Sequence, residues 1–205
     1  GLKTNSNLPE VIVRLLYMRG VNDFSGVQRF FYSSTEHSKT NLQWLYDPFH
    51  MKDCKEACDR VITAINSGEK IMVLGDYDVD GTCGVSLFYL FLKELGTEPE
   101  IYIPDRITEG YGISNDAIDS AESQGIKLIV AIDCGITAYE KVEYAKQKGI
   151  EFIICDHHQP PDDIPEALAV IDVHRKDDEY PYKDLCGTGV AYKLATAVAI
   201  KLGKP

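Results

Sequence analysis

Acidic and imidazole side chains gather in three short clusters of this sequence, and each cluster directly follows a run of apolar residues. The clusters are Asp76-Tyr77-Asp78-Val79-Asp80-Gly81, Asp133-Cys134-Gly135 and Asp156-His157-His158. Carboxylate oxygens with imidazole nitrogens suit Mn²⁺ or Mg²⁺ better than a thiolate zinc site does. If the three apolar runs are neighbouring parallel strands, their carboxyl ends meet at one edge of the sheet, where open α/β folds bind ligands.

The first cluster has a well-known alternative. Aspartates at alternate positions of an extended or turning segment can face one cation, and a calcium EF-hand loop also begins D-x-D-x-D-G. That loop needs a glutamate at its twelfth position and a preceding helix, whereas the twelfth residue here is Leu87 and a β-type run precedes the motif. Three like charges without a cation would repel one another, so the cluster predicts a metal site.

The other two clusters also have alternatives. Asp133 by itself could be an ordinary helix N-cap, and only its position after a predicted strand favours a site. His157 and His158 point in different directions, so that one could bind metal while the other contacts substrate. Zinc could instead bind cysteines 83, 134 and 155, but each lies beside a stronger ligand. We interpret these thiols as small, semi-buried residues.

The elements that would position these clusters alternate regularly along the chain. Strands are predicted over residues 70–74, 99–103, 127–132, 151–155 and 167–171. Helices are predicted over residues 82–95, 114–124, 137–148 and 189–201. This alternation is typical of βαβ units. The predicted fold class is α/β: a doubly wound, mostly parallel sheet with helices on both faces, preceded by a short helical N-terminal segment.

Two domains are expected. Residues 1–68 are predicted to be a helical segment packed on the core, with helices over 9–19, 24–31 and 51–67. Asp53 is the expected cap of the third helix and Gly68 its stop. Residues 69–205 are predicted to form the α/β domain.

Composition limits the classes of protein. The 205 residues, 44% of them hydrophobic, can bury a full core. The sequence has no apolar run of about 18 residues and no apolar secretion signal at its start, and its six cysteines form no CxxC pair. We therefore expect reduced thiols and a cytoplasmic protein. The net charge of −11 argues against a nucleic-acid partner, unless bound divalent cations supply a positive field.

The runs DYDVDG, VAIDCG and DHH together resemble the DHH phosphoesterase superfamily. Residues 103–114 (IPDRITEGYGIS) and 186–194 (CGTGVAYKL) are similar to its RecJ branch, the single-strand-specific DNA exonucleases. Residues 14–20 and the pair Asp47-Pro48 are also similar, so the resemblance covers most of the chain.

The resemblance implies roles for individual residues. The implied metal ligands are Asp76, Asp78, Asp80, Asp133 and His157. Asp133 would bridge two ions, and Asp76 would be either a ligand or a carboxylate that supports the ligands. Asp156 would orient the histidines, and His158 would contact the scissile phosphate, so that His158 and Asp133 are the catalytic residues. The implied substrate-binding residues are Arg106, His158, Gly187 and Gly189; an ion pair of Arg106 with Asp105 or Glu109 is the alternative.

The activity implied by the resemblance is metal-dependent phosphodiester hydrolysis with two Mn²⁺ or Mg²⁺ ions, which would clamp the phosphate and activate a water. The substrate would be single-stranded DNA, degraded from its 5′ end during repair and recombination. A single-strand-binding protein or a helicase would be a partner, with no membrane and no obligate oligomer. Two alternatives stay open: a hydrolase of pyrophosphate or short oligonucleotides, and a non-catalytic module that binds DNA or a replication partner.

The sequence departs from the family at two points. Asp172-Val173, followed by His174, stands where the branch usually has Asn-Pro, which leaves the role of this position open. A G-T-x-A-D-type motif with the family's last metal-binding aspartate is not found before Pro205. We therefore expect an N-terminal fragment of a longer protein, which could be inactive alone and whose basic DNA-binding surface lies mostly in the missing part.

Overall fold

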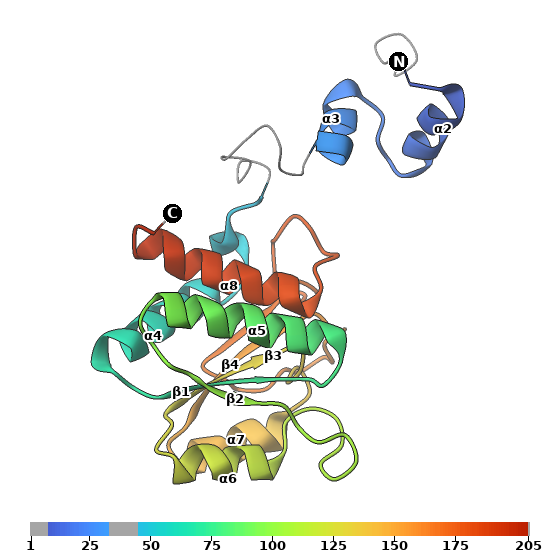
Figure 1. Cartoon of the computed structure of the whole chain (residues 1–205). Coiled ribbons are helices and arrows are strands. Elements are labelled where there is room, and N and C mark those ends of the chain that lie inside the picture. The colour runs from blue at the N-terminus through green and yellow to red at the C-terminus, as the bar shows by residue number, and fades with distance from the viewer. Residues whose placement is uncertain (1–7, 33–44, 205) are drawn as a thin grey trace. The chain divides into compact units, whose positions relative to one another are not determined.

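A computed structural model describes residues 8–32 and 45–204 of the chain (Figure 1). Residues 1–7 and 33–44 of the predicted N-terminal segment, including the start where no secretion signal is expected, lie outside these residues. The chain divides into two compact units, residues 1–46 and 47–205, and each is described by itself. Within the described residues, no helix is both long and apolar enough to cross a membrane.

The first unit contains two short helices, α2 (Glu10–Met18) and α3 (Phe24–Tyr32), close to their predicted positions. Leu16 of α2 and Val27 of α3 are both buried in one small apolar cluster. The two helices therefore share one contact through an amphipathic face of each.

The second unit is built on one parallel sheet. Its strands are β1 (Ile71–Gly75), β2 (Glu100–Tyr102), β3 (Leu128–Ile132), β4 (Glu151–Asp156) and β5 (Ala169–Asp172), in the order β2-β1-β3-β4-β5. All four pairs of neighbouring strands are parallel. β1 and β3 are buried along their whole length, which explains why they are continuous apolar runs. The predicted α/β class is confirmed.

Helices cover both faces of this sheet (Figure 1). On one face lie α4 (Cys54–Ser67), α5 (Val79–Glu94) and α8 (Gly187–Lys201), with the short 3₁₀ helix η2 (Pro48–His50) beside them. On the other lie α6 (Asn115–Ser123) and α7 (Tyr139–Gln147). Alternate residues of the strands supply the two cores: Val73 and Val130 face the first layer, and Met72 and Ile129 face the second. α4 belongs to this unit, while the predicted division after residue 68 stays a prediction.

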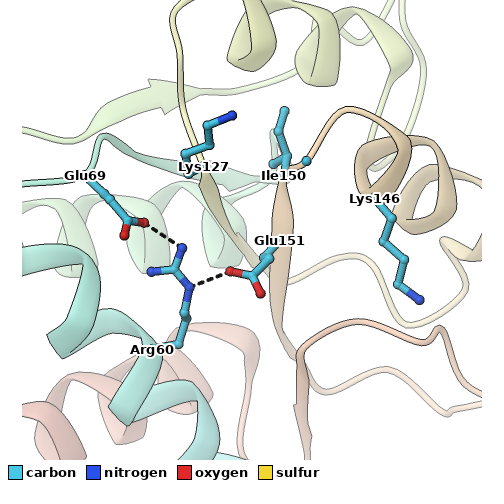
Figure 2. Close-up of a pocket in the computed structure, with 7 residues that line it drawn as sticks. Arg60, Glu69, Lys127, Lys146, Ile150 and Glu151 are labelled. Atoms are coloured by element: carbon cyan, nitrogen blue, oxygen red, sulfur yellow. Dashed lines mark hydrogen bonds and ion pairs between the residues drawn. The ribbon is translucent and has the colours of Figure 1, made fainter. Parts of the chain in front are cut away.

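Ion pairs lie at the edge of the sheet where the strands begin. Arg60 of α4 donates to Glu69, just before β1, and to Glu151, the first residue of β4, both at 2.6 Å (Figure 2). These bonds tie α4 to the start of two strands, so this edge has a structural role.

At the opposite edge the strands end in register. Gly75 of β1 pairs with Ile132 of β3, which pairs with Cys155 of β4, which pairs with Ile171 of β5. The residue that follows each of these four is an aspartate: Asp76, Asp133, Asp156 and Asp172. The parallel register therefore brings four acidic residues to one edge.

Two local expectations were wrong. α5 begins at Val79 rather than residue 82, because the Asp78 carboxylate accepts a hydrogen bond from the Gly81 N–H (2.9 Å) and caps the helix. Of the two expected forms of the DYDVDG run, extended or turning, the structure shows a turn after β1 that leads through the Asp78 cap into the first turn of α5. Asp53 lies at the N-cap position of α4 in a left-handed conformation (φ 61°) and makes no side-chain cap bond. Gly68 (φ 65°) does end α4 as predicted.

Candidate metal centre

Two groups of potential metal ligands meet at the carboxyl edge of the sheet. Asp133, His157 and His158 form one group, and Asp76, Asp78 and Asp133 form the other. Within each group, one ligand atom from each residue lies within 4.8 Å of the others. Because Asp133 belongs to both, the structure brings together residues that are far apart in the sequence around one shared carboxylate.

The carboxylate of Asp133 is buried in a setting that disfavours its charged form. Its side chain is 2% exposed, and its Oδ1 atom has no hydrogen-bond partner among the described residues. His157 Nε2 lies 3.2 Å from that oxygen without hydrogen-bond geometry. Burial, together with the charges of Asp80 and Asp78, raises the pKa of Asp133 to about 7. A bound cation would offset these costs, since it supplies the missing partner and the opposite charge.

Asp80 is held by the start of α8. Its carboxylate accepts hydrogen bonds from the N–H groups of Gly187 (2.7 Å) and Thr188 (2.8 Å). Burial acts to raise the pKa of Asp80, but the hydrogen bonds from Thr188, Cys186 and Gly187 together outweigh it and the net shift is downward. Asp80 Oδ2 lies 3.5 Å from His157 Nε2. Asp80 is therefore an ionised carboxylate at the site, although neither group of ligand atoms includes it.

The turn after β1 places the remaining acidic residues. Asp76 is 2% exposed, its Oδ1 has no hydrogen-bond partner among the described residues, and burial raises its pKa. Asp78 directs Oδ1 at the Gly81 N–H. A Cβ atom on Gly81 would collide with the backbone of Asp76, so this turn requires glycine.

Asp156 acts on the two histidines. Its Oδ1 accepts from the N–H groups of His157 (2.8 Å) and His158 (3.2 Å) and lies 2.7 Å from His158 Nδ1, while Oδ2 accepts from the Ile136 N–H (3.0 Å). Burial acts to lower the pKa of His158, but the hydrogen bond to Asp156 and the charges of the nearby aspartates together outweigh it and raise the pKa. With Nδ1 occupied in this way, Nε2 is the ring atom of His158 that remains for a ligand.

A row of rings leads from the histidines to Arg106. The His158 and Tyr111 rings lie 6.4 Å apart, the Tyr111 and Tyr77 rings 6.4 Å apart, and Arg106 Cζ lies 5.3 Å from the Tyr77 centroid. Among the described residues no ion pair joins Arg106 to Asp105 or Glu109. Their carboxylates instead accept bonds from backbone N–H groups and from hydroxyl groups. The guanidinium therefore lies beside the site, stacked on an aromatic ring.

Gly187 and Gly189 were expected to bind substrate. The Gly187 N–H is taken by Asp80, and a Cβ at this position would lie 2.5 Å from Asp133 Oδ1. Gly187 therefore shapes the metal centre through close approach. A Cβ on Gly189 would meet Leu185 at 3.2 Å, and the substrate role of Gly189 stays a prediction.

The structure adds two residues whose role the sequence left open. Asp172 is fully buried, accepts a hydrogen bond from the His174 N–H (2.7 Å), and has its pKa raised by burial to about 6. His174 Nδ1 lies 2.5 Å from the backbone oxygen of His157. His174 thus supports the backbone of a candidate ligand. In the sequence, the only signal for a role of these two residues is that Asp172 ends a predicted strand.

The thiols do not form a zinc site. Cys134 and Cys155 are buried, Cys83 is exposed on α5, and no described cysteine belongs to either group of ligand atoms. Burial raises the pKa of Cys134 and Cys155, which keeps both protonated. The donors that do converge are carboxylates and imidazoles, with two buried and unpartnered oxygens among them. This donor set fits Mn²⁺ or Mg²⁺.

Known proteins resemble this chain over most of its length. The family model described as "DHH family, N-terminal domain" matches residues 70–204. The single-stranded-DNA-specific exonuclease RecJ of Bacillus subtilis is 38% identical over 198 residues, which are 97% of this chain and 24% of that protein. RecJ of Escherichia coli is 34% identical over 194 residues, 94% of this chain and 32% of that protein. The chain thus spans about a quarter to a third of the length of these curated relatives.

Solved structures show the same likeness. A crystal structure of exonuclease RecJ bound to manganese matches with a TM-score of 0.70 and 32% identity, over 76% of this chain and 39% of that one. RecJ from Thermus thermophilus in complex with Mn²⁺ matches with a TM-score of 0.64 and 29% identity, over 76% of this chain and 22% of that one.

Proposed function

This chain belongs to the DHH family and is similar to RecJ exonucleases over most of its length, and from this premise we propose that it hydrolyses phosphodiester bonds in single-stranded DNA with two Mn²⁺ or Mg²⁺ ions. We further propose that it releases nucleotides from the 5′ end. DNA repair and recombination would be the setting, where a helicase or a single-strand-binding protein would present the strand.

The observation that carries the proposal is the position of Asp133. Its carboxylate belongs to both groups of ligand atoms, and its buried Oδ1 lacks a hydrogen-bond partner among the described residues. One carboxylate shared between two sets of ligands suits a bridge between two cations, the arrangement used to hold attacking and leaving oxygens in phosphoester hydrolysis. We propose Asp76, Asp78, Asp80, Asp133 and His157 as the ligands. Asp80, whose Oδ2 lies 3.5 Å from His157 Nε2, would take the place of His158, which is assigned to the substrate below.

His158 is proposed to face the substrate. Its side chain is 48% exposed, against 29% for His157, and Asp156 fixes Nδ1 so that Nε2 points away from that carboxylate. Because Asp156 raises the pKa of the His158 ring, the ring can be protonated and can donate a hydrogen bond to a phosphoryl oxygen. Arg106, stacked on Tyr77, would bind a phosphate of the same strand.

The bound ions would polarise the phosphoryl oxygens and lower the pKa of the attacking water. The protein contributes a fixed set of charges. The start of α8 keeps Asp80 ionised, and Asp156 sets the orientation of both histidines. Fixed dipoles and charges of this kind need no reorganisation during the reaction. The bound cations would also let this acidic chain approach DNA, because they make the local charge at the site positive.

The test uses the intact protein and four substrates: a 3′-labelled single strand, the matching duplex, a dinucleotide and pyrophosphate. We expect stepwise loss of the single strand with Mn²⁺ or Mg²⁺, none with chelator, and none for a folded Asp133→Ala variant. Preferential turnover of pyrophosphate or dinucleotide would favour a small-substrate hydrolase. Binding of the strand without cleavage by the wild type would favour a non-catalytic DNA-binding module.

A further inference from the structure

Two large apolar side chains of the second unit are unusually exposed to solvent. Ile107 is 92% exposed and Val79 is 79% exposed, more than any other large apolar side chain in the described part of the second unit. Single exposed apolar residues are common on proteins, so their position decides whether they matter. Val79 lies between Asp78 and Asp80 in the first turn of α5.

Ile107 lies in a turn whose backbone is fixed by several hydrogen bonds. Asp105 Oδ1 accepts from the N–H groups of Ile107 (2.8 Å) and Thr108 (3.0 Å), and Glu109 Oε1 accepts from the Asp105 N–H (2.9 Å). Glu109 is in turn anchored by the Tyr102 hydroxyl (2.6 Å) and by Ser114. A turn fixed in this way presents its side chain at little further entropic cost when a ligand binds.

The two segments lie side by side. Arg106, next to Ile107, stacks on Tyr77, which is two residues before Val79. Tyr77 also contacts Tyr111 of the same loop as Ile107. Figure 1 shows this loop, between β2 and α6, at the same side of the molecule as the start of α5. Val79 and Ile107 therefore belong to the two segments that carry the row of rings leading to His158.

We propose that Val79 and Ile107 contact the faces of unpaired nucleobases in a strand whose phosphate lies at the metal centre. The inference rests on the proposed function and adds residues that determine its preference for single strands. Neither side chain can bind a phosphate, whereas the face of a base is apolar and open in a single strand. In a duplex those faces are covered by stacked neighbours, so the two contacts would be lost.

The experiment compares two strands of equal length on the intact protein with Mn²⁺: oligothymidylate, and a strand of tetrahydrofuran abasic residues. Wild type is compared with the double variant Val79→Thr, Ile107→Ser. A second comparison uses Leu90→Ser, which changes a residue that is 60% exposed near the other end of α5. We expect KM of the double variant for oligothymidylate to rise about tenfold, with kcat and KM for the abasic strand changed less than about twofold. Leu90→Ser should match wild type.

The outcomes separate the two proposals. An equal rise in KM for both strands would show that the contact is not with bases, and unchanged KM for both would show no contact; either result overturns the inference and leaves the nuclease proposal standing. A wild-type protein that neither binds nor cleaves either strand would overturn both. Urea unfolding of each variant should give the wild-type midpoint, because the positions are exposed, and checks that the fold is retained.

Discussion

The backbone N–H of Gly187 donates a hydrogen bond to the carboxylate of Asp80, 107 residues earlier in the chain, at a distance of 2.7 Å. The same glycine has no room for a side chain, because a Cβ would lie 2.5 Å from Asp133 Oδ1. One residue at the start of α8 therefore sets the position of a carboxylate on α5 and packs directly against another at the end of β3.

Gly187→Ala should weaken the metal centre. The added methyl group must push Asp133 or α8 away, and either movement disturbs two proposed ligands at once. Loss of support around metal ligands typically costs tenfold to a hundredfold in affinity. We expect at least a tenfold rise in the Kd for Mn²⁺, measured by calorimetry, with a smaller loss of stability.

Gly125→Ala is the matched control for this change. Gly125 has φ +73° and nothing within 4 Å of an added Cβ. The alanine should therefore cost about 1 kcal/mol of stability through its backbone conformation. Its Kd for Mn²⁺ should equal that of wild type. Wild-type affinity in the Gly187→Ala protein would contradict the proposed coupling of α8 to the site.

The sheet could be predicted because buried parallel strands are continuous apolar runs, and because the chain repeats strand, helix and glycine. The meeting of Asp76, Asp133 and His157 followed from the same pattern, since parallel strands bring their carboxyl ends to one edge. Their arrangement in the DYDVDG turn did not follow. Asp78 and Asp80 could each have capped a helix, and only the folded chain shows that Asp78 does.

Contacts between residues far apart in the chain could not be predicted from the sequence. The bond from Gly187 to Asp80 and the contact of His174 with His157 depend on how α8 and the segment after β5 are placed. Nothing local in the sequence specifies either contact. The expected cap at Asp53 failed for the same reason, because its carboxylate bonds to Arg175 instead of the helix.

Asp133→Asn should make the metal-free protein more stable at pH 8 than the wild type. The pKa of Asp133 in the fold is about 7, above its ordinary value of about 3.9. Between these values the folded state binds more protons than the unfolded state, so the wild-type contribution to stability falls as the pH rises through this window. Each pKa unit corresponds to about 1.4 kcal/mol.

Urea unfolding in chelator at pH 5 and pH 8 would check this. The advantage of the variant in the free energy of unfolding should be small at pH 5, near the start of this window, and larger at pH 8, beyond its end. Excess Mn²⁺ should reverse the order at pH 8, because the amide is a poorer ligand. A stability difference that is independent of pH would show that the charge of Asp133 is not the cause.

Asp156→Asn should loosen both histidines. An amide cannot accept all the bonds that Asp156 accepts, from Ile136, His157 and His158. We expect the Kd for Mn²⁺ to rise about tenfold to a hundredfold. The pKa of His158, which Asp156 raises, should fall, and an NMR titration of the metal-free protein would measure it. Asp162→Asn, at an exposed ion pair with Lys176, is the control and should leave both quantities unchanged.

Arg175→Met should destabilise the fold without changing the metal centre. Arg175 Nη1 donates to Asp53 Oδ2 (2.6 Å) and to the Val170 oxygen (2.5 Å), and Asp53 Oδ2 also accepts from the Val170 N–H (3.2 Å). The pair thus occupies both backbone groups of a residue on β5, an outer strand of the sheet. Removing the guanidinium leaves the half-buried Asp53 carboxylate without its opposite charge, which we expect to cost about 1–3 kcal/mol.

The double variant Asp53→Asn, Arg175→Met tests the cause of that loss. Asparagine tolerates the left-handed conformation of this position, and it can still accept the hydrogen bond from Val170 without carrying a charge. If the loss comes from the unpaired carboxylate, the double variant should recover more than half of it in urea unfolding. It should also keep the wild-type Kd for Mn²⁺, because Asp53 and Arg175 belong to neither group of ligand atoms. A double variant as unstable as Arg175→Met would assign the loss to the uncovered edge of β5, an exposed strand edge that would then also favour aggregation.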